Sequence, residues 1–116
     1  MIRTVPLLRG VRVLDFTWIA AGPSGTLMLA LAGADVIKVE SRAKLDNYRK
    51  NFAKEGDVDR SILFASVNAG KRSIAINAKT TEGIALLLDL VRSADAVVEN
   101  FSPGVMERLG LGFEEL

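Results

Sequence analysis

The arrangement of residues 11–40 constrains the fold more than any other feature of the chain. Residues 11–16 (VRVLDF) and 35–40 (DVIKVE) have the composition of buried strands, and the apolar run 26–32 between them predicts a short helix that ends at Gly33. Strand, helix and strand in this order form a βαβ unit, whose strands run parallel. Because parallel strands are covered on both faces, the sequence predicts an α/β fold with helices on both faces of a parallel sheet.

The second half of the chain repeats this alternation. Residues 72–77 alternate as a strand, Thr80 or Thr81 is the expected cap of a helix, residues 96–100 form the next strand, and residues 105–109 open a further helix. The middle helix should bury one face, because its apolar residues recur at helical spacing. That face consists of Ile84, Leu87, Leu88 and Val91.

Residues 41–61 depart from this pattern and predict a long, polar and mobile surface excursion between the two units. One interpretation is a solvated charged loop, and the other is a phosphate-contacting flap, because its cations follow the second strand directly. Residues 62–67 are compatible with a short helix or a strand. Residues 1–10 form a lead-in in which Pro6 and Gly10 mark turns.

The loop predicted at residues 17–25 lies at the carboxyl end of the first strand, where open α/β sheets bind ligands. Backbone N–H groups and the helix dipole favour anions at such a position. Gly22 and Gly25 do not complete a G-x-G-x-x-G dinucleotide fingerprint. The loop is therefore read either as a nucleotide-like ligand site or as a structural tight turn.

Polar side chains also follow the other strands. Asn77 and Lys79 come after one predicted strand, and Asn100 and Arg108 come after another. Taken singly, these residues are compatible with turns and solvated cations. Taken together at one edge of a sheet, they favour a ligand that carries phosphates and a base.

Composition excludes several classes of function. Lys and Arg number 15 against 14 Asp and Glu, which gives no indication of nucleic-acid binding. The chain has neither Cys nor His, so it offers no Cys/His zinc site, no thiol nucleophile and no histidine base; we expect no metal. Residues 16–34 are uncharged, but a Gly-Pro-Ser-Gly-Thr run interrupts them, so a membrane span is not expected and a cytoplasmic location fits.

Six segments in order resemble the family III CoA-transferases (CaiB/BaiF type), the group that includes formyl-CoA transferase, carnitine CoA-transferase and α-methylacyl-CoA racemase. They cover nearly the whole chain, so their ordered combination is specific where one alone would be weak. The segments are GVRVLDFT (10–17), AGP (21–23), GADVIKVE (33–40), NAGKRSI (68–74), VENF (98–101) and PGVMERLG (103–110).

The resemblance implies that residues 1–116 are the CoA-binding, Rossmann-like N-terminal segment of a longer enzyme, with coenzyme A as substrate and carrier. Lys79 and Arg108 would screen phosphates, and groups near Ile76 would hold the adenine. Ser41 stands where the family commonly has Arg, and Arg42 is the expected substitute. Asn77 stands where Asp is frequent, and Ala20 where formyl-CoA transferase has Gln, which argues against an oxalate/formate enzyme. The full set of implied CoA-binding residues is Ala20, Ala21, Ser41, Arg42, Ile76, Asn77, Lys79, Asn100, Phe101 and Arg108.

The resemblance also implies a reaction that this segment does not complete. Family members move CoA between carboxylic acids through an aspartyl intermediate, and that Asp would lie beyond residue 116; Asp15, Asp35 and Asp95 match no catalytic position. Residues 112–116 stop where a helix should begin, in keeping with a truncated chain. The partners would be acyl-CoA and carboxylic acid substrates. An interlocked homodimer would explain why the helix at 26–32 has no polar face.

Three other functions remain open at this stage. A racemase-type epimerase belongs to the same family. A Rossmann oxidoreductase fragment would use Glu40 to hold the ribose of NAD. A non-enzymatic interaction module would use the apolar helix at 26–32 as a partner-binding surface.

Overall fold

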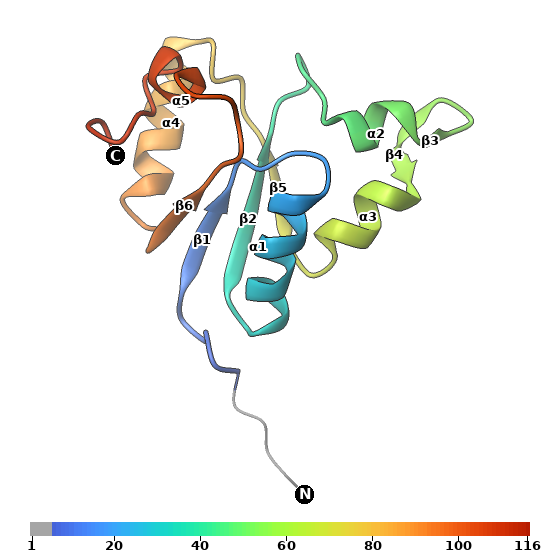
Figure 1. Ribbon diagram of the computed structural model, residues 1–116. Helices are drawn as coiled ribbons and strands as arrows, with labels where there is room; N and C mark the ends of the chain where they lie inside the picture. The colour runs from blue at the N-terminus through green and yellow to red at the C-terminus, as the bar shows by residue number, and fades with distance from the viewer. Residues whose placement is uncertain (1–5) are drawn as a thin grey trace, which may run out of the picture.

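A four-stranded parallel sheet forms the centre of the computed structural model, which describes residues 6–116 (Figure 1). The strand order is β5-β2-β1-β6, and every neighbouring pair is parallel. The predicted parallel α/β architecture is confirmed, and residues 1–5 of the predicted lead-in lie outside the described residues. The strands are β1 (Arg12–Asp15), β2 (Asp35–Glu40), β5 (Arg72–Ala75) and β6 (Ala96–Val98).

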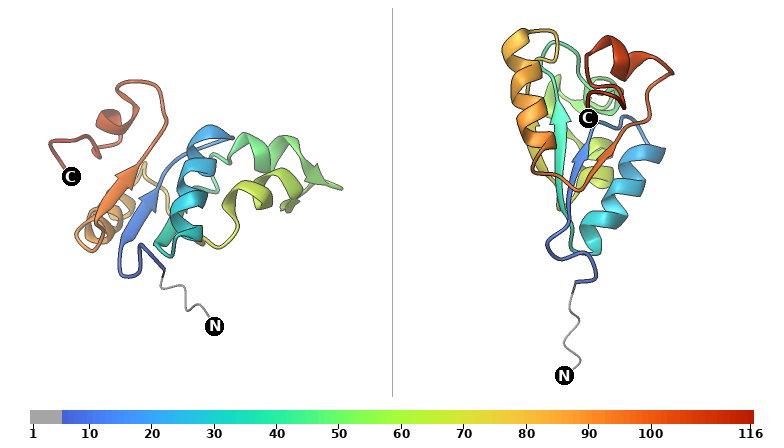
Figure 2. Two further views of the ribbon diagram at one scale, coloured as in Figure 1. Left: turned by 60° about the horizontal axis from the view of Figure 1, so that its bottom comes forward. Right: turned by 90° about the vertical axis from the view of Figure 1, so that its left-hand side faces the viewer.

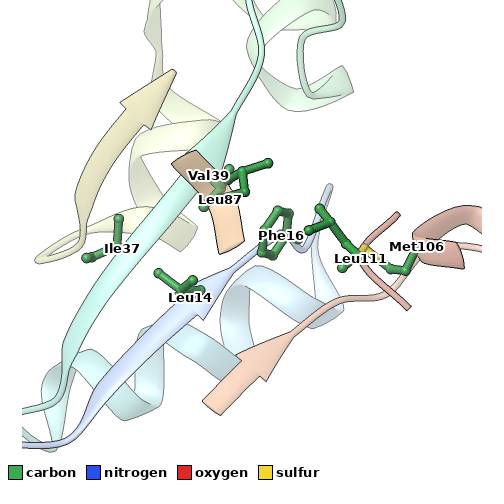
Figure 3. Close-up of a cluster of buried hydrophobic side chains, with 7 residues drawn as sticks. All are labelled: Leu14, Phe16, Ile37, Val39, Leu87, Met106 and Leu111. Atoms are coloured by element: carbon green, nitrogen blue, oxygen red, sulfur yellow. The ribbon is translucent and has the colours of Figure 1, made fainter. Parts of the chain in front are cut away.

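Helices cover both faces of the sheet: α1 (Ala21–Leu31) lies on one and α4 (Thr81–Val91) on the other (Figure 2). The alternation of side chains along the strands explains the two layers. Leu14 belongs to the cluster that packs under α4, whereas its neighbour Val13 packs with residues of α1. Figure 3 shows the buried side chains of the larger cluster, which are Leu14, Phe16, Ile37, Val39, Leu87, Met106 and Leu111.

Helix α4 follows its prediction closely. Thr80 is the N-cap residue, and its hydroxyl accepts a hydrogen bond of 3.0 Å from the backbone N–H of Gly83. Leu87 is completely buried, while Leu86, on the opposite side, is exposed. The short helix α5 (Val105–Arg108) follows Gly104, whose φ of 81° is left-handed.

The start of α1 differs from its prediction, because the helix begins at Ala21 rather than at residue 26. Residues 21–25 (AGPSG) are poor helix formers, which explains the error. Pro23 is tolerated because a residue in the first turn has no helical partner for its N–H. Most of the predicted loop at 17–25 is therefore the first turn of a helix.

The predicted surface excursion at residues 41–61 contains regular structure that the sequence did not indicate. The segment contains α2 (Asn47–Asn51) and a hairpin of β3 (Ala53–Lys54) and β4 (Asp57–Ser61). Arg49 stabilises this arrangement: it donates to both carboxylate oxygens of Glu40, at 2.8 and 2.9 Å, and to Asp59. The open choice for residues 62–67 is settled in favour of a helix, α3 (Ile62–Asn68).

Helix α1 leaves apolar side chains exposed in the described chain. Met28 is 64% and Leu31 is 70% exposed, although a helix of this composition is normally buried on several sides. Burial of these side chains by a partner chain therefore remains a prediction. Within residues 6–116, no helix is both long enough and apolar enough to cross a membrane.

Candidate functional site

The carboxyl edge of the sheet contains a topological switch point between β1 and β6. From β1 the chain proceeds through β2 to β5 on one side, and α4 then returns it to β6 on the other side of β1 (Figure 1). Loops after the two central strands diverge at such a point and leave a crevice for a ligand. Here these loops are residues 16–20 and residues 99–104.

Asn100 joins the two loops. Its side-chain oxygen accepts a 2.8 Å hydrogen bond from the N–H of Trp18, and its amide nitrogen donates to the carbonyl of Trp18 at 3.0 Å. The rings of Trp18 and Phe101 pack edge to face with centroids 5.6 Å apart. The predicted site residues Asn100 and Phe101 thus lie directly beside the β1–α1 loop.

Ala20 and Ala21 occupy the first turn of α1, next to this junction. Ala20 is the N-cap residue, and no side chain caps the helix by a hydrogen bond. Gly22 is required by packing: a Cβ at that position would come within 2.5 Å of the Thr17 Cβ and 3.0 Å of the Asn100 Cγ. Small residues therefore allow the turn and Asn100 to approach each other.

A buried charge cluster lies beneath the first turn of α1. The Asp15 carboxylate accepts hydrogen bonds from the hydroxyls of Thr17 (2.5 Å) and Thr26 (2.6 Å) and from the Lys71 ammonium (2.9 Å). Lys71 also donates to the carbonyl of Pro23 at 2.9 Å. These bonds fix the first turn of the helix to the end of β1.

Lys38 adds a second ammonium to the same cluster. It lies 3.8 Å from the Asp15 carboxylate and donates to the carbonyl of Thr17. Burial lowers the pKa of both Lys38 and Lys71. Burial alone raises the pKa of the Asp15 carboxyl, but the Lys38 charge and the hydrogen bonds that the carboxylate accepts outweigh it and hold the pKa below its ordinary value.

Lys79 and Arg108 share one open groove at the start of α4 and α5, with a volume of about 740 Å³. This size lies within the usual range for small-molecule sites. Asn77 shapes the loop above it, because its side-chain oxygen accepts from the N–H of Lys79 at 3.1 Å. The groove is lined by Ala78, Lys79, Thr80, Thr81, Ile84, Val105, Arg108, Leu109 and Gly110.

Ser41 and Arg42 line a different and smaller pocket of about 210 Å³, at the ends of β2 and β5. Glu40 and Arg49 form part of its wall, and the hydrogen bonds that Arg49 donates to the Glu40 carboxylate raise the pKa of Arg49. Ile76 lies between the two pockets, where its N–H donates to the carbonyl of Glu40 at 2.9 Å. It also belongs to the hydrophobic cluster that contains Ala78 and Phe101.

The predicted residues therefore lie along one edge of the sheet, in three neighbouring places rather than in one pocket. Sequence reasoning missed Trp18, Asp46 and the charge cluster of Asp15, Lys38 and Lys71. A signal for the cluster existed: Lys38 interrupts the apolar strand VIKV, and a buried ammonium requires partners. Among residues 6–116, no group of three or more His, Cys, Asp or Glu side chains is placed to hold a metal ion.

Comparison with known proteins gives a consistent result. The family described as CoA-transferase family III matches residues 8–116. An acyl-CoA transferase of Fusarium pseudograminearum is 47% identical over 116 residues, covering 94% of this chain and 25% of its own length. A formyl-CoA:oxalate CoA-transferase of Escherichia coli O6:H1 is 44% identical over 109 residues, covering 94% of this chain and 26% of its own length.

Solved structures agree with the sequence comparison. A CaiB/BaiF family protein from Brucella suis superposes with a TM-score of 0.83 at 40% identity, covering 97% of this chain and 30% of that one. Rv3272 from Mycobacterium tuberculosis, in its orthorhombic form, gives a TM-score of 0.83 at 38% identity, with the same two coverages of 97% and 30%. The chain thus spans about a quarter of the length of the curated relatives it matches.

Proposed function

The chain belongs to CoA-transferase family III, and from that premise we propose that it is the CoA-binding part of an enzyme that moves CoA between carboxylic acids. One observation carries the proposal most directly: Lys79 and Arg108, which are far apart in the sequence, line the same groove between the start of α4 and helix α5. Two cations in one open groove suit a ligand with several phosphates.

The proposed contacts follow from where each residue lies. Lys79 and Arg108 screen the phosphates from the two sides of the groove, and Ile76 and Asn77 border the position proposed for the adenine. Ala20 and Ala21 allow the ligand to approach the backbone of α1. The remaining proposed contacts are Ser41 and Arg42 at the smaller pocket and Asn100 and Phe101 at the switch point.

Asn100 has a more specific part in this proposal than the sequence indicated. Its side-chain amide is engaged with both backbone groups of Trp18. We therefore assign its side chain to holding the β1–α1 loop, and assign ligand contact to the backbone of residues 100–101.

The acyl-transfer step is proposed to use an aspartate beyond residue 116 as the nucleophile. A carboxylate nucleophile divides one difficult acyl transfer into two easier steps. Asp15 is a poor substitute because it is completely buried and fully hydrogen-bonded, and Asp35 is paired with Arg12 and Arg72. The substrates on this proposal are an acyl-CoA and a carboxylic acid.

The exposed apolar side chains of α1 support a homodimer as the proposed assembly of the complete enzyme. Met28 and Leu31 would be covered by a second copy, which the interlocked arrangement expected from the sequence would supply. We propose a cytoplasmic location on the same basis of family and composition.

The oxidoreductase alternative is less well supported, because the carboxylate that would bind the ribose of NAD already accepts hydrogen bonds within the protein. Glu40 accepts two hydrogen bonds from Arg49 and one of 3.1 Å from Ser73, so it is not free for a ribose. The epimerase alternative differs from the transferase only in catalytic residues outside this chain, and exchange of the α-hydrogen of a chiral acyl-CoA with deuterium from the solvent would reveal it.

Calorimetric titration of the complete gene product with CoA tests the proposal, with NAD as the control ligand. We expect CoA to bind with micromolar affinity and NAD to give no heat of binding. Binding of NAD without CoA would reverse the assignment. Exchange of labelled CoA between two carboxylic acids would then distinguish transfer from epimerisation.

A further inference from the structure

Ile19, in the loop between β1 and α1, has a backbone conformation that few residues of its kind adopt. Its φ is +69°, in the left-handed region. A β-branched side chain is a steric outlier there, and such a conformation persists only where the surroundings impose it. Glu55 is the one other residue in the described chain that combines a positive φ with a side chain, and it lies in the tight turn between β3 and β4.

Three side chains from elsewhere in the fold impose the conformation of this loop. Lys38 donates to the carbonyl of Thr17, and Asn100 holds both backbone groups of Trp18. The N–H of Ile19 itself donates to the Asp46 carboxylate at 3.0 Å. The first two restraints come from the strands that flank the loop, but the third comes from the 41–61 segment.

Asp46 connects two parts of the structure at once. Its second carboxylate oxygen accepts a 2.7 Å hydrogen bond from the N–H of Tyr48, which caps α2. The residue is only 3% exposed, so these donors replace the water that would otherwise solvate its carboxylate. Through Arg49 and Glu40, α2 is in turn fixed to the end of β2.

A second contact joins the same two regions. The Lys44 ammonium lies 5.3 Å from the centre of the Trp18 ring, within range of a cation–π interaction. The segment that precedes α2 thus contacts two successive residues of the loop. These two contacts link the shape of the β1–α1 loop to the docking of residues 41–61.

We propose that Asp46 is a positioning residue that holds the β1–α1 loop in its ligand-binding shape and couples it to the docking of residues 41–61. Its oxygens are occupied by Ile19 and Tyr48, so it acts through the loop backbone rather than on the ligand. The role in ligand binding rests on the proposed function. The restraint on the loop does not, because it follows from the hydrogen bonds alone.

Hydrogen exchange in the complete gene product tests the restraint without any ligand. The variant Asp46→Ala is compared with Ser61→Ala, a matched control: Ser61 is also buried and also bonds to the α2 segment, through the carbonyl of Tyr48, but does not touch the loop. We expect amide exchange in a peptide covering residues 16–22 to be at least about tenfold faster in Asp46→Ala, the factor for one lost hydrogen bond to a charged acceptor. Exchange in Ser61→Ala should match the parent protein, and equal rates in all three proteins would overturn the proposal.

Titration with CoA forms the second arm and separates the two proposals. If the parent protein binds CoA, Asp46→Ala should bind it about tenfold more weakly, with Ser61→Ala within twofold of the parent. Equal affinities in all three would refute the positioning role while leaving the proposed function intact. Failure of the parent to bind CoA would refute the proposed function, and the exchange rates would still decide whether Asp46 restrains the loop.

The double variant Ile19→Gly/Asp46→Ala covers the case in which Asp46→Ala folds but is too unstable for the exchange and titration measurements. Glycine adopts a positive φ without steric cost, so it should restore part of the lost melting temperature. It should not restore CoA affinity, because the loop would then be free to move. Recovery of full affinity in the double variant would contradict the proposal.

Discussion

The ammonium of Lys71 lies 2.9 Å from the carboxylate of Asp15, although the two residues are 56 positions apart in the sequence. Lys71 immediately precedes β5, Asp15 ends β1, and β2 lies between these strands. The pair therefore connects the edge of the sheet to its centre beneath α1. Because both side chains are buried, neither charge can be compensated by water if the other is removed.

Replacing Lys71 by Met should destabilise the protein by about 3 kcal/mol, the usual loss when one partner of a buried ion pair is removed. The variant also removes one of the donors to the carbonyl of Pro23, which keeps its hydrogen bond from the Thr26 hydroxyl. Urea unfolding of the complete gene product, followed by circular dichroism, measures the effect. Lys54→Met, at an exposed position, is the control and should change the unfolding midpoint very little.

The protein should be less stable at acidic and at neutral pH than at alkaline pH. Asp15 causes the loss of stability in acid, and Lys38 causes the rise toward alkaline pH. The pKa of Asp15 is lower in the folded protein than its ordinary 3.8, so the stabilisation from its carboxylate is present above pH 3.8 and is lost as the pH falls through the lowered value. The pKa of Lys38 is lower than its ordinary 10.5, so the folded protein releases this proton first and stability rises as the pH approaches 10.5.

The urea midpoint measured from pH 3 to pH 10 checks this profile. In Lys38→Met the alkaline rise should shrink, because one of the two buried ammonium groups is gone. The acidic loss should persist in that variant, since the Asp15 carboxylate keeps its bonds from Thr26 and Lys71. An unchanged alkaline rise would show that Lys38 is not responsible for it.

Gly22→Ala should destabilise the protein by roughly 1–3 kcal/mol, the usual cost of overpacking. The added methyl group would lie 2.5 Å from the Thr17 Cβ and displace the β1–α1 loop. Gly25→Ala, in the same helix, has nothing within 4 Å of the new Cβ. It should leave stability unchanged or raise it by up to about 1 kcal/mol through helix propensity, and melting temperatures of the two variants give the comparison.

Lys79→Ala and Arg108→Ala should each weaken CoA binding by about tenfold or more, because each removes a charged donor from a shared groove. The loss should shrink as salt concentration rises, since the groove is open and the charges are screened. Arg92→Ala, at the C-cap of α4 and outside the lining of the groove, is the control. Affinities measured at two salt concentrations test both statements.

Much of the fold follows from local patterns that the sequence displays openly. The strands at 35–40 and 72–77, the cap at Thr80 and the buried face of α4 were all predictable, because periodicity and capping act over a few residues. The start of α1 was not, because AGPSG has low helix propensity and is held helical by contacts below it, such as the Lys71 bond to Pro23. Residues 41–61 were misread for a similar reason: Arg49 organises them through Glu40, which precedes the segment.

The candidate site divides in the same way. The location of the site at the carboxyl edge of the sheet could be predicted, since parallel strands bring all their carboxyl ends together. Its separation into a larger groove at Lys79 and Arg108, a smaller pocket at Ser41 and Arg42, and the Asn100 junction depends on how side chains pack. Asp46 gave no signal, because an aspartate in a polar segment looks solvated until its donors are known.

By itself, the sequence determined the order of strands and helices in residues 11–40 and 72–109, the parallel sheet and the family to which the chain belongs, because hydrophobic periodicity and short motifs are local properties. Only the tertiary structure decided that Asp15, Lys38 and Lys71 share one buried cluster and that Ile19 is held in a left-handed conformation. These features arise from contacts between residues far apart in the chain, whose energies depend on burial and geometry that no local pattern records.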